Sequence, residues 1–568
     1  MFKGRHQRVF RFRWVVHAIL AIVFIWGSLF SGSNGFVVAE DTNQAGVLIQ
    51  KMSPQEKIGQ LFLVTFDGTD ISEGTQIYDL ITNHYIGGVV LSAEKNNFQE
   101  DSTVEGIYTL TSGLQTLAWQ KTQGEVSVLV ENLTDPLPVY VPLFIGISQE
   151  GNGYPSDQIL SGLSSIPSAM ALGATWTPAL ASDIGAVLGK ELSSLGFNFY
   201  LGPTLDVVDS SIPNAISISG TRSFGGDPYW VGEMGKAVIA GLHQGSAGKL
   251  AVIAKHFPGL GGVDRSPDNE VSTVQKSLEQ LKQLELAPFF SVTGQADSIE
   301  SITDGLLVSP IRFQGFQGNI RATTKPVNFD STALSQLMSL NEFSEWRDNG
   351  GLMVSDSLGS RALRKFYDPT ETVFESWQMA RTAFLAGNDL LYLKDFRASG
   401  DRDEYTSILQ TLNFFTQKYL EDPIFAQNVD VSVTRILNQK AKQYSSFNLE
   451  NIIPKHDSLS EVGNSTQVSS VVAQKAVTLI SPSISELDNL LPSPPTLYEY
   501  ITIFTDVRTS TQCATCTPQK LLSSTSFESA LLKLYGPQAS KEILVNRLSS
   551  YSFGQLIGLL DDISEPTD

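Results

Sequence analysis

Residues 250–261 of this 568-residue chain read Leu-Ala-Val-Ile-Ala-Lys-His-Phe-Pro-Gly-Leu-Gly. Five consecutive apolar residues are typical of a β-strand that is buried on both faces, because such a strand needs no polar side. The apolar run stops at Lys255 and His256, and the Pro and Gly residues that follow indicate a loop. The stretch therefore predicts a buried strand that delivers an ammonium and an imidazole group to the loop at its end.

Seven further apolar runs resemble this one, and several are separated by stretches with helical spacing such as residues 230–243 and 371–385. Continuous apolar strands that alternate with helices are typical of a parallel sheet covered on both faces. Eight such units favour an α/β fold, a (β/α)8 TIM-type barrel, although an open doubly wound sheet has the same pattern. The predicted strands are residues 61–66, 88–91, 143–147, 197–201, 250–254, 305–308, 351–354 and 390–393.

The region after the barrel has a different composition. An Asn- and Ser-rich segment, residues 451–466, is typical of a linker. We therefore assign residues 40–450 to the barrel and residues 467–568 to a short C-terminal α/β domain, with a helix, a strand and a second helix.

Charged side chains follow several of the predicted strands. Asp206 follows the fourth strand with Arg222 in the same loop, Lys255 and His256 follow the fifth, and Asp356 follows the seventh. Taken alone, each has an ordinary explanation, since Asp206 can pair with Arg222 and Asp356 can begin a helix. Their convergence at one end of a barrel is costly without a function, and that end is where barrel enzymes carry their active sites.

Five short motifs occur in order over residues 202–389: Gly202-Pro203-Thr204-Leu205-Asp206, Arg222-Ser223-Phe224-Gly225 with Asp227-Pro228, Lys255-His256-Phe257-Pro258-Gly259, Ser355-Asp356-Ser357-Leu358 and Ala386-Gly387-Asn388-Asp389. In this order they resemble the N-terminal barrel of glycoside hydrolase family 3, closest to its β-N-acetylhexosaminidase branch. Residues from 467 onward resemble the start of the family's α/β sandwich domain and are too few to complete it.

This resemblance implies retaining hydrolysis of terminal β-glycosidic bonds, of N-acetylglucosamine or β-glucoside type. Asp356 would be the nucleophile that forms a glycosyl-enzyme intermediate. Asp206, Arg222, Lys255 and His256 would bind the sugar. The substrate would be a β-linked glycan or a cell-wall fragment, and this chemistry requires no metal or organic cofactor.

The chain departs from the family pattern at the acid/base. Hexosaminidases of this family carry Asp-Ser-His in the loop after the Lys-His motif, and the His is the acid/base. Ungapped counting puts Ser266 at the Asp position and Asp268 at the His position, and no histidine lies in this loop. Ser148 also replaces a sugar-binding Asp, and Ser309 replaces a family-like His. The family pattern therefore leaves the acid/base unassigned.

Three hypotheses follow. An active glycosidase would use Asp268 or Glu270 as its acid/base, with Asp264 as a weaker candidate, because a carboxylic acid near the Asp356 charge can have a raised pKa. A catalytically degenerate barrel would bind glycans without cleaving them. An exported acidic scaffold would serve protein contacts.

The net charge of −20 disfavours nucleic acid as a partner. Residues 1–39 hold five basic residues and no acid, followed by an apolar run, so they read as a signal peptide or signal anchor. Without these five charges the chain stands at −25. We therefore expect an exported protein, extracellular, periplasmic or membrane-tethered, whose only membrane contact is that anchor.

The chain has two cysteines, Cys513 and Cys516. In an exported protein such a close pair favours a local disulfide. Zinc would need a second pair of ligands. A redox motif would need a βαβ context, which the surrounding pattern lacks.

Overall fold

The computed structural model describes residues 42–561 except 101–102, 124–137, 152, 213–219, 371 and 491–495. The predicted signal segment lies outside the described residues and stays a prediction. Within the described part of the chain, no helix combines the length and the apolar character needed to cross a bilayer.

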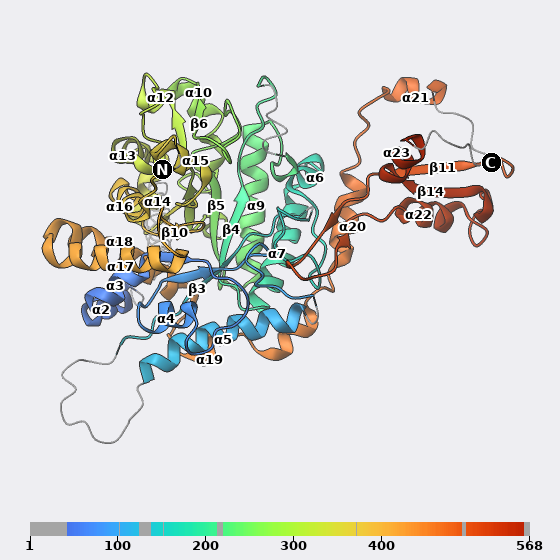
Figure 1. The fold of residues 1–568 in the computed structure, drawn as a ribbon. Coiled ribbons are helices and arrows are strands. Elements are labelled where there is room, and N and C mark those ends of the chain that lie inside the picture. The colour runs from blue at the N-terminus through green and yellow to red at the C-terminus, as the bar shows by residue number, and fades with distance from the viewer. Residues whose placement is uncertain are drawn as a thin grey trace, which may run out of the picture. The chain divides into compact units, whose positions relative to one another are not determined.

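Eight parallel strands form one sheet in the order β10-β1-β2-β3-β4-β5-β7-β9, and helices lie around it (Figure 1). A parallel bridge from Val354 to Leu390 joins the two end strands and completes the ring. This confirms the predicted (β/α)8 barrel and excludes the open doubly wound sheet. The strands are β1 (Phe62–Val64), β2 (Gly88–Val90), β3 (Phe144–Ile147), β4 (Phe199–Thr204), β5 (Ala251–Phe257), β7 (Gly305–Val308), β9 (Leu352–Ser355) and β10 (Leu391–Leu393).

Three of the long covering helices begin directly after an Asp residue whose side chain caps them. Asp227 caps α9 (Pro228–Gly245) by accepting hydrogen bonds from the backbone N–H groups of Tyr229 and Trp230. Pro228 occupies the first helical position, where its missing N–H costs nothing. The other long helices around the barrel are α5 (Thr103–Gln123), α7 (Pro178–Ser194), α16 (Ser376–Ala386), α17 (Glu404–Glu421) and α18 (Pro423–Gln443).

A second, two-stranded parallel sheet was not predicted. It pairs β6 (Ser272–Val274) with β8 (Ile311–Phe313), which lie in the segments that follow β5 and β7. Three residues are too few to show a strand pattern in the sequence. This small sheet fastens the loop that carries Asp268 and Glu270 to the segment after the neighbouring barrel strand.

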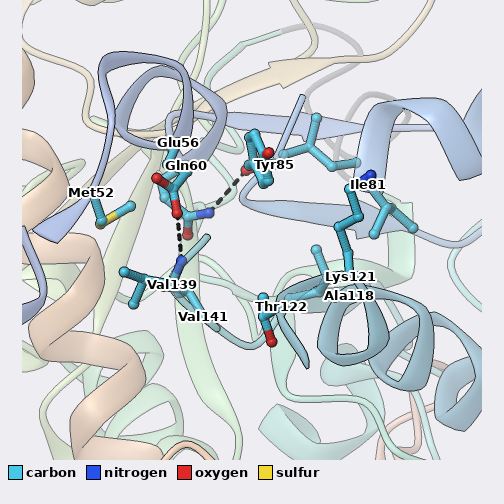
Figure 2. A pocket seen from close by; sticks show the side chains of 12 residues that line it. Met52, Glu56, Gln60, Ile81, Tyr85, Ala118, Lys121, Thr122, Val139 and Val141 are labelled. Carbon is cyan, nitrogen blue, oxygen red and sulfur yellow. Dashed lines mark hydrogen bonds between the residues drawn. The ribbon is translucent and has the colours of Figure 1, made fainter. Parts of the chain in front are cut away.

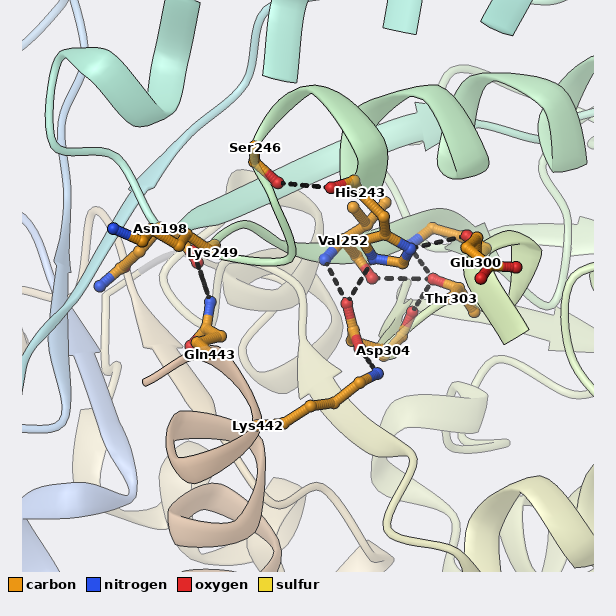
Figure 3. Close-up of polar contacts among 12 residues, drawn as sticks. Asn198, His243, Ser246, Lys249, Val252, Glu300, Thr303, Asp304, Lys442 and Gln443 are labelled. Atoms are coloured by element: carbon orange, nitrogen blue, oxygen red, sulfur yellow. Dashed lines mark hydrogen bonds and ion pairs between the residues drawn. The ribbon is translucent and has the colours of Figure 1, made fainter. Parts of the chain in front are cut away.

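The amino ends of the central strands meet in a buried polar network (Figure 3). Asp304, directly before β7, accepts hydrogen bonds from Val252 N–H at 2.9 Å and from the Lys442 ammonium at 2.6 Å. Its other close partner is His243, whose Nε2 lies 2.9 Å from Asp304 Oδ2. Burial alone would raise the pKa of Asp304, but Lys442 and His243 hold it well below its usual range. Burial would lower the pKa of His243, and Asp304 more than reverses this effect.

The C-terminal segment has its own small sheet, in which β11 (Ile501–Thr505) and β14 (Leu548–Ser552) pair in parallel. In the sequence between these two strands, β12 (Thr509–Ser510) and β13 (Gln519–Lys520) form an antiparallel hairpin. Cys513 and Cys516 at the tip of this hairpin form a disulfide, which confirms the predicted pairing.

We expect Asp304→Asn to lower the free energy of unfolding by about 3 kcal/mol near pH 5.5, because it leaves His243 and Lys442 without their carboxylate. The lowered pKa of Asp304 means that its contribution is lost as the pH falls below about 4. The raised pKa of His243 means that its contribution is present below about pH 6.5 and is lost as the pH rises further. Urea unfolding at pH 3, 5.5 and 9 should therefore show the largest difference from wild type at pH 5.5. The exposed Asp297→Asn variant should change stability by less than about 1 kcal/mol, and an equal loss for Asp304→Asn at all three pH values would contradict the assignment.

Candidate active site

The carboxyl ends of β4, β5 and β9 bring the predicted site residues to one mouth of the barrel. Lys255 and His256 are the fifth and sixth residues of β5, whereas Asp206 lies two residues after β4 and Asp356 lies directly after β9. Parallel strands place such residues at the same end because every strand runs in the same direction. The structure thus groups side chains that lie up to 150 residues apart in the sequence.

Lys255 forms a buried ion pair with Glu150, which follows β3. Its Nζ lies 2.8 Å from Glu150 Oε2, and the two side chains are 8% and 6% exposed. Lys255 also donates a hydrogen bond to Ser148 Oγ at 2.9 Å, and Thr204 Oγ donates to Glu150 Oε1 at 2.6 Å. Burial alone would raise the pKa of Glu150, but Lys255, Thr204 and Arg222 together lower it. Glu150 is therefore a fixed carboxylate that holds the Lys255 ammonium in place.

His256 and Asp206 form a second pair beside the first. His256 Nδ1 lies 2.7 Å from Asp206 Oδ2, and Leu260 N–H donates to Asp206 Oδ1 at 2.7 Å. Burial would raise the pKa of Asp206, but His256, Leu260 and Arg222 lower it. An ionised Asp206 accepts the proton on Nδ1, which leaves Nε2 as the second polar atom of the ring. Within the described part of the chain, Nε2 has no hydrogen-bond partner, so it is available to a ligand.

Arg222 ends the short helix η1 (Gly220–Arg222) in the loop after β4. Its charge lowers the pKa of both Glu150 and Asp206, so it lies close to both carboxylates. The loops after β4 and β5 also approach closely at Gly261, where an added Cβ would lie 1.5 Å from the Val207 carbonyl oxygen. A side chain at Gly261 would therefore push apart the loops after β4 and β5.

Asp356 is half-buried at the end of β9 and is oriented by two donors. Ser309 Oγ, at the end of β7, donates to Asp356 Oδ2 at 2.9 Å, and the Ser357 N–H donates to Oδ1 at 2.8 Å. These two bonds fix the plane of the carboxylate. The serine at the position where a histidine was expected therefore serves to orient Asp356.

The loop acids lie in a different environment. Glu270 is exposed and pairs with Arg265 at 3.0 Å, and Asp268 accepts a 3.4 Å hydrogen bond from Ser266 Oγ. Asp264 accepts from the Thr273 N–H at 2.8 Å and so holds together the two ends of the loop. Among the described residues, neither Asp268 nor Glu270 forms a hydrogen bond or ion pair with Asp356. The structure thus brings together Asp206, Arg222, Lys255 and His256 but leaves the three loop acids outside that group.

Sequence reasoning missed Glu150 as a member of the site. The residue stood in the stretch Ser148-Gln149-Glu150, directly after a predicted strand, which was the available signal. Ser148, which stands in place of a sugar-binding Asp of the family pattern, accepts a hydrogen bond from Lys255. The position of a residue after a strand identifies candidate site residues. The sequence alone does not show which of these residues pair across neighbouring strands, as Glu150 does with Lys255.

The opposite end of the barrel has a polar cluster and a small cavity of its own. Asp389, from the last of the five motifs, precedes β10 and accepts hydrogen bonds from Arg347 at 3.0 Å and from Met353 N–H at 2.9 Å. A cavity beside Glu56 and Val139 lies before β1 and β3 and holds only about 20 Å³, too little for a sugar (Figure 2). Both features are structural parts of the amino end.

Glu150→Gln should lower the free energy of unfolding by about 3 kcal/mol at pH 7, because it leaves the buried Lys255 ammonium without a counter-charge. The lowered pKa of Glu150 means that its contribution is present at neutral pH and is lost as the pH falls below about 4.3. Thermal and urea unfolding at pH 7 and pH 3 should therefore show a smaller difference at pH 3. The control is Glu94→Gln, whose partner Lys394 is near the surface, and we expect it to cost less than about 1 kcal/mol. Equal losses for the two variants would contradict the buried pairing.

Residues 54–438 match the family model described as the glycosyl hydrolase family 3 N-terminal domain. Beta-hexosaminidase A of Pseudoalteromonas piscicida is 28% identical over 313 residues, which cover 53% of this chain and 46% of that protein. A beta-hexosaminidase of Neisseria meningitidis serogroup C is 26% identical over 277 residues, which cover 47% of this chain and 67% of that protein. The chain spans about half the length of the first of these curated relatives.

Solved structures share the fold. A glycoside hydrolase family 3 beta-N-acetylglucosaminidase from Paenibacillus sp. str. FPU-7 superposes with a TM-score of 0.65 at 21% identity, covering 90% of this chain and 84% of that one. The beta-N-acetylhexosaminidase from Beutenbergia cavernae DSM 12333 superposes with a TM-score of 0.52 at 23% identity, covering 69% of this chain and 99% of that one. At these identities the likeness concerns the architecture alone.

Proposed function

The chain belongs to glycosyl hydrolase family 3, and from this premise we propose that it is a retaining glycosidase that hydrolyses terminal β-glycosidic bonds. The observation that carries the proposal is the oriented Asp356 carboxylate at the same end of the barrel as Arg222, Lys255 and His256. A carboxylate nucleophile and a set of hydroxyl-binding groups are the two parts that glycoside hydrolysis by retention needs.

In the proposed reaction, an Asp356 oxygen attacks the anomeric carbon of the bound sugar, and the bond from that carbon to the leaving oxygen breaks. A proton from the acid/base goes to the leaving oxygen. Water then attacks the glycosyl-enzyme ester, gives its proton to the same acid/base and releases Asp356. The hydrogen bonds from Ser309 and Ser357 hold the Asp356 carboxyl group in place before the first step.

The charged pairs would bind the sugar in the orientation that this attack requires. Lys255 offers N–H donors, and His256 Nε2 is free to exchange a hydrogen bond with a hydroxyl. Holding the sugar rigidly lowers the entropic part of the barrier. We favour terminal N-acetylglucosamine as the substrate, because curated relatives are named beta-hexosaminidase, with β-glucosides as the alternative. The N-terminal pattern supports an exported enzyme.

The acid/base belongs to the loop after β5 in this proposal, and its candidates are Asp268 and Glu270. Exposed carboxylates can reach a leaving group only if the loop and the substrate come together. The pairing of Glu270 with Arg265 would have to open for Glu270 to act as an acid. Among the residues that the structure describes, Asp268 is held by Ser266 alone. On this comparison we favour Asp268 over Glu270.

We expect Asp356→Ala to lower kcat on a chromogenic β-glycoside by at least about 10³-fold, because no other group replaces the nucleophile. Wild-type protein incubated with a 2-fluoro glycosyl inhibitor should gain the mass of one glycosyl group, located at Asp356 by peptide mapping, and the variant should gain none. The control Asp348→Ala changes an exposed carboxylate on α14 (Asn341–Asp348) and should behave as wild type. An adduct on another residue would refute the role of Asp356.

Replacing the acid/base should affect poor leaving groups more than good ones, since a good leaving group departs without a proton. We expect Asp268→Asn to lower kcat/KM for a β-linked disaccharide by about 10²-fold and to leave a dinitrophenyl glycoside almost unchanged. Glu270→Gln is measured in parallel, with the exposed Glu279→Gln as control. Unchanged disaccharide turnover in both Asp268→Asn and Glu270→Gln would remove the loop acids from the mechanism.

A glycan-binding barrel without catalysis is the second candidate, and the exposed, outward position of the loop acids favours it. Binding of N-acetylglucosamine oligomers by calorimetry, without turnover and without an adduct on Asp356, would select this alternative.

A further inference from the structure

The C-terminal disulfide hairpin, residues 508–521, contacts the loops at the catalytic end of the barrel. Ala514 N–H donates to Asn96 Oδ1 at 2.7 Å, and Thr517 N–H donates to Glu100 Oε2 at 2.8 Å, both in the segment after β2. The hairpin thus belongs to a different part of the chain but lies against the loops that follow the barrel strands. None of these contacts was used in the proposed reaction.

Gln512 is the most enclosed contact of this hairpin. Its side chain has no exposed surface. Its Oε1 accepts a hydrogen bond from Leu160 N–H at 2.6 Å, and its Nε2 donates to the Gln158 carbonyl oxygen at 2.7 Å. A fully buried amide that forms hydrogen bonds with two backbone groups of one segment restrains that segment in the way that a neighbouring β-strand does.

The same segment is held from the barrel side by Gln149. Gln149 Oε1 accepts from the N–H groups of Gln158 and Ile159 at 2.9 and 3.0 Å, and its Nε2 donates to the Ile159 carbonyl oxygen at 2.9 Å. Residues 158–160 therefore lie between two buried glutamine amides, one from the loop after β3 and one from the C-terminal hairpin. Gln149 directly precedes Glu150, the partner of Lys255.

The loop after β3 is also tied to itself between these two contacts. Asp157 accepts hydrogen bonds from Gly151 N–H at 2.7 Å and Gly153 N–H at 2.8 Å, which closes the loop on itself. At Gly153, where φ is +77°, an added Cβ would lie 2.9 Å from Leu521 of the hairpin. The hairpin thus touches this loop at the Gln512 amide and again at Leu521.

From these contacts we infer that the disulfide hairpin braces the loop after β3, and that Gln512 is a positioning residue that keeps Glu150 opposite Lys255. The Cys513–Cys516 bond restrains the four residues that follow Gln512, so the amide is presented from a closed loop. Without the brace, residues 149–160 would move more, and the buried pair at their start would be held less well. The kinetic part of this inference rests on the proposed function.

The test compares Gln512→Ala with Gln538→Ala, an exposed glutamine of the same C-terminal segment. Hydrogen–deuterium exchange of the intact protein should show faster uptake in residues 149–160 for Gln512→Ala, with uptake in α9 unchanged. The Gln538→Ala variant should exchange as wild type. Unchanged uptake in residues 149–160 overturns the inference. If Gln512→Ala does not fold, the double variant Cys513→Ser, Cys516→Ser is used, with the same expected direction.

Kinetics separates positioning from mere stabilisation. Gln512→Ala should raise KM for a chromogenic β-glycoside about tenfold while kcat changes by less than about threefold, because loss of two hydrogen bonds loosens the sugar-binding pair but leaves Asp356 in place. A fall in kcat at unchanged KM, or wild-type kinetics despite faster exchange, overturns the positioning role. A wild-type protein without turnover contradicts the proposed function instead, and the exchange result then decides the brace by itself.

Discussion

Lys255 is a charged side chain in a nearly closed environment, and the carboxylate of Glu150 makes that position tolerable. An unpaired ammonium at such a depth would cost several kcal/mol or lose its proton. The pair requires that β3 and β5 end at the same level, with β4 between them to supply the Thr204 hydroxyl. A parallel barrel brings the ends of β3, β4 and β5 side by side, so the ion pair and the fold depend on each other.

Much of the fold could be predicted from the sequence because buried parallel strands are uniformly apolar. The run before Lys255 is one example, and β6 is a counter-example, since three residues paired to a distant segment leave no pattern. For the site, position after a strand identified Asp206, Lys255 and Asp356. It could not identify Glu150 as a partner of Lys255, because pairing across two strands depends on register, which the apolar pattern does not report.

The serines at Ser148 and Ser309 show why substitution in a family motif does not by itself mean loss of function. In the sequence, each serine replaces a charged or imidazole side chain at a position of the family's site. In the structure, each hydroxyl is bonded to a charged site residue, Ser148 to Lys255 and Ser309 to Asp356. A smaller polar group that keeps one hydrogen bond preserves the orientation of its partner and leaves more room in the mouth. The substitution by serine at these two positions is therefore compatible with a change in the ligand as well as with a loss of catalysis.

The histidines at the two ends of the barrel differ in how many of their ring nitrogens have a hydrogen-bond partner. This difference distinguishes a group that stabilises the fold from one that can bind a ligand. At the amino end, Asp304 has a partner for each carboxylate oxygen, and His243 has one for each ring nitrogen. At the carboxyl end, His256 gives one nitrogen to Asp206 and, among the described residues, keeps Nε2 for something else. A fully hydrogen-bonded group such as His243 stabilises the fold, whereas a polar atom without a partner, such as His256 Nε2, costs some of that stability. The half-buried His256 ring, with Nε2 open, is therefore placed to bind a ligand rather than to stabilise the fold.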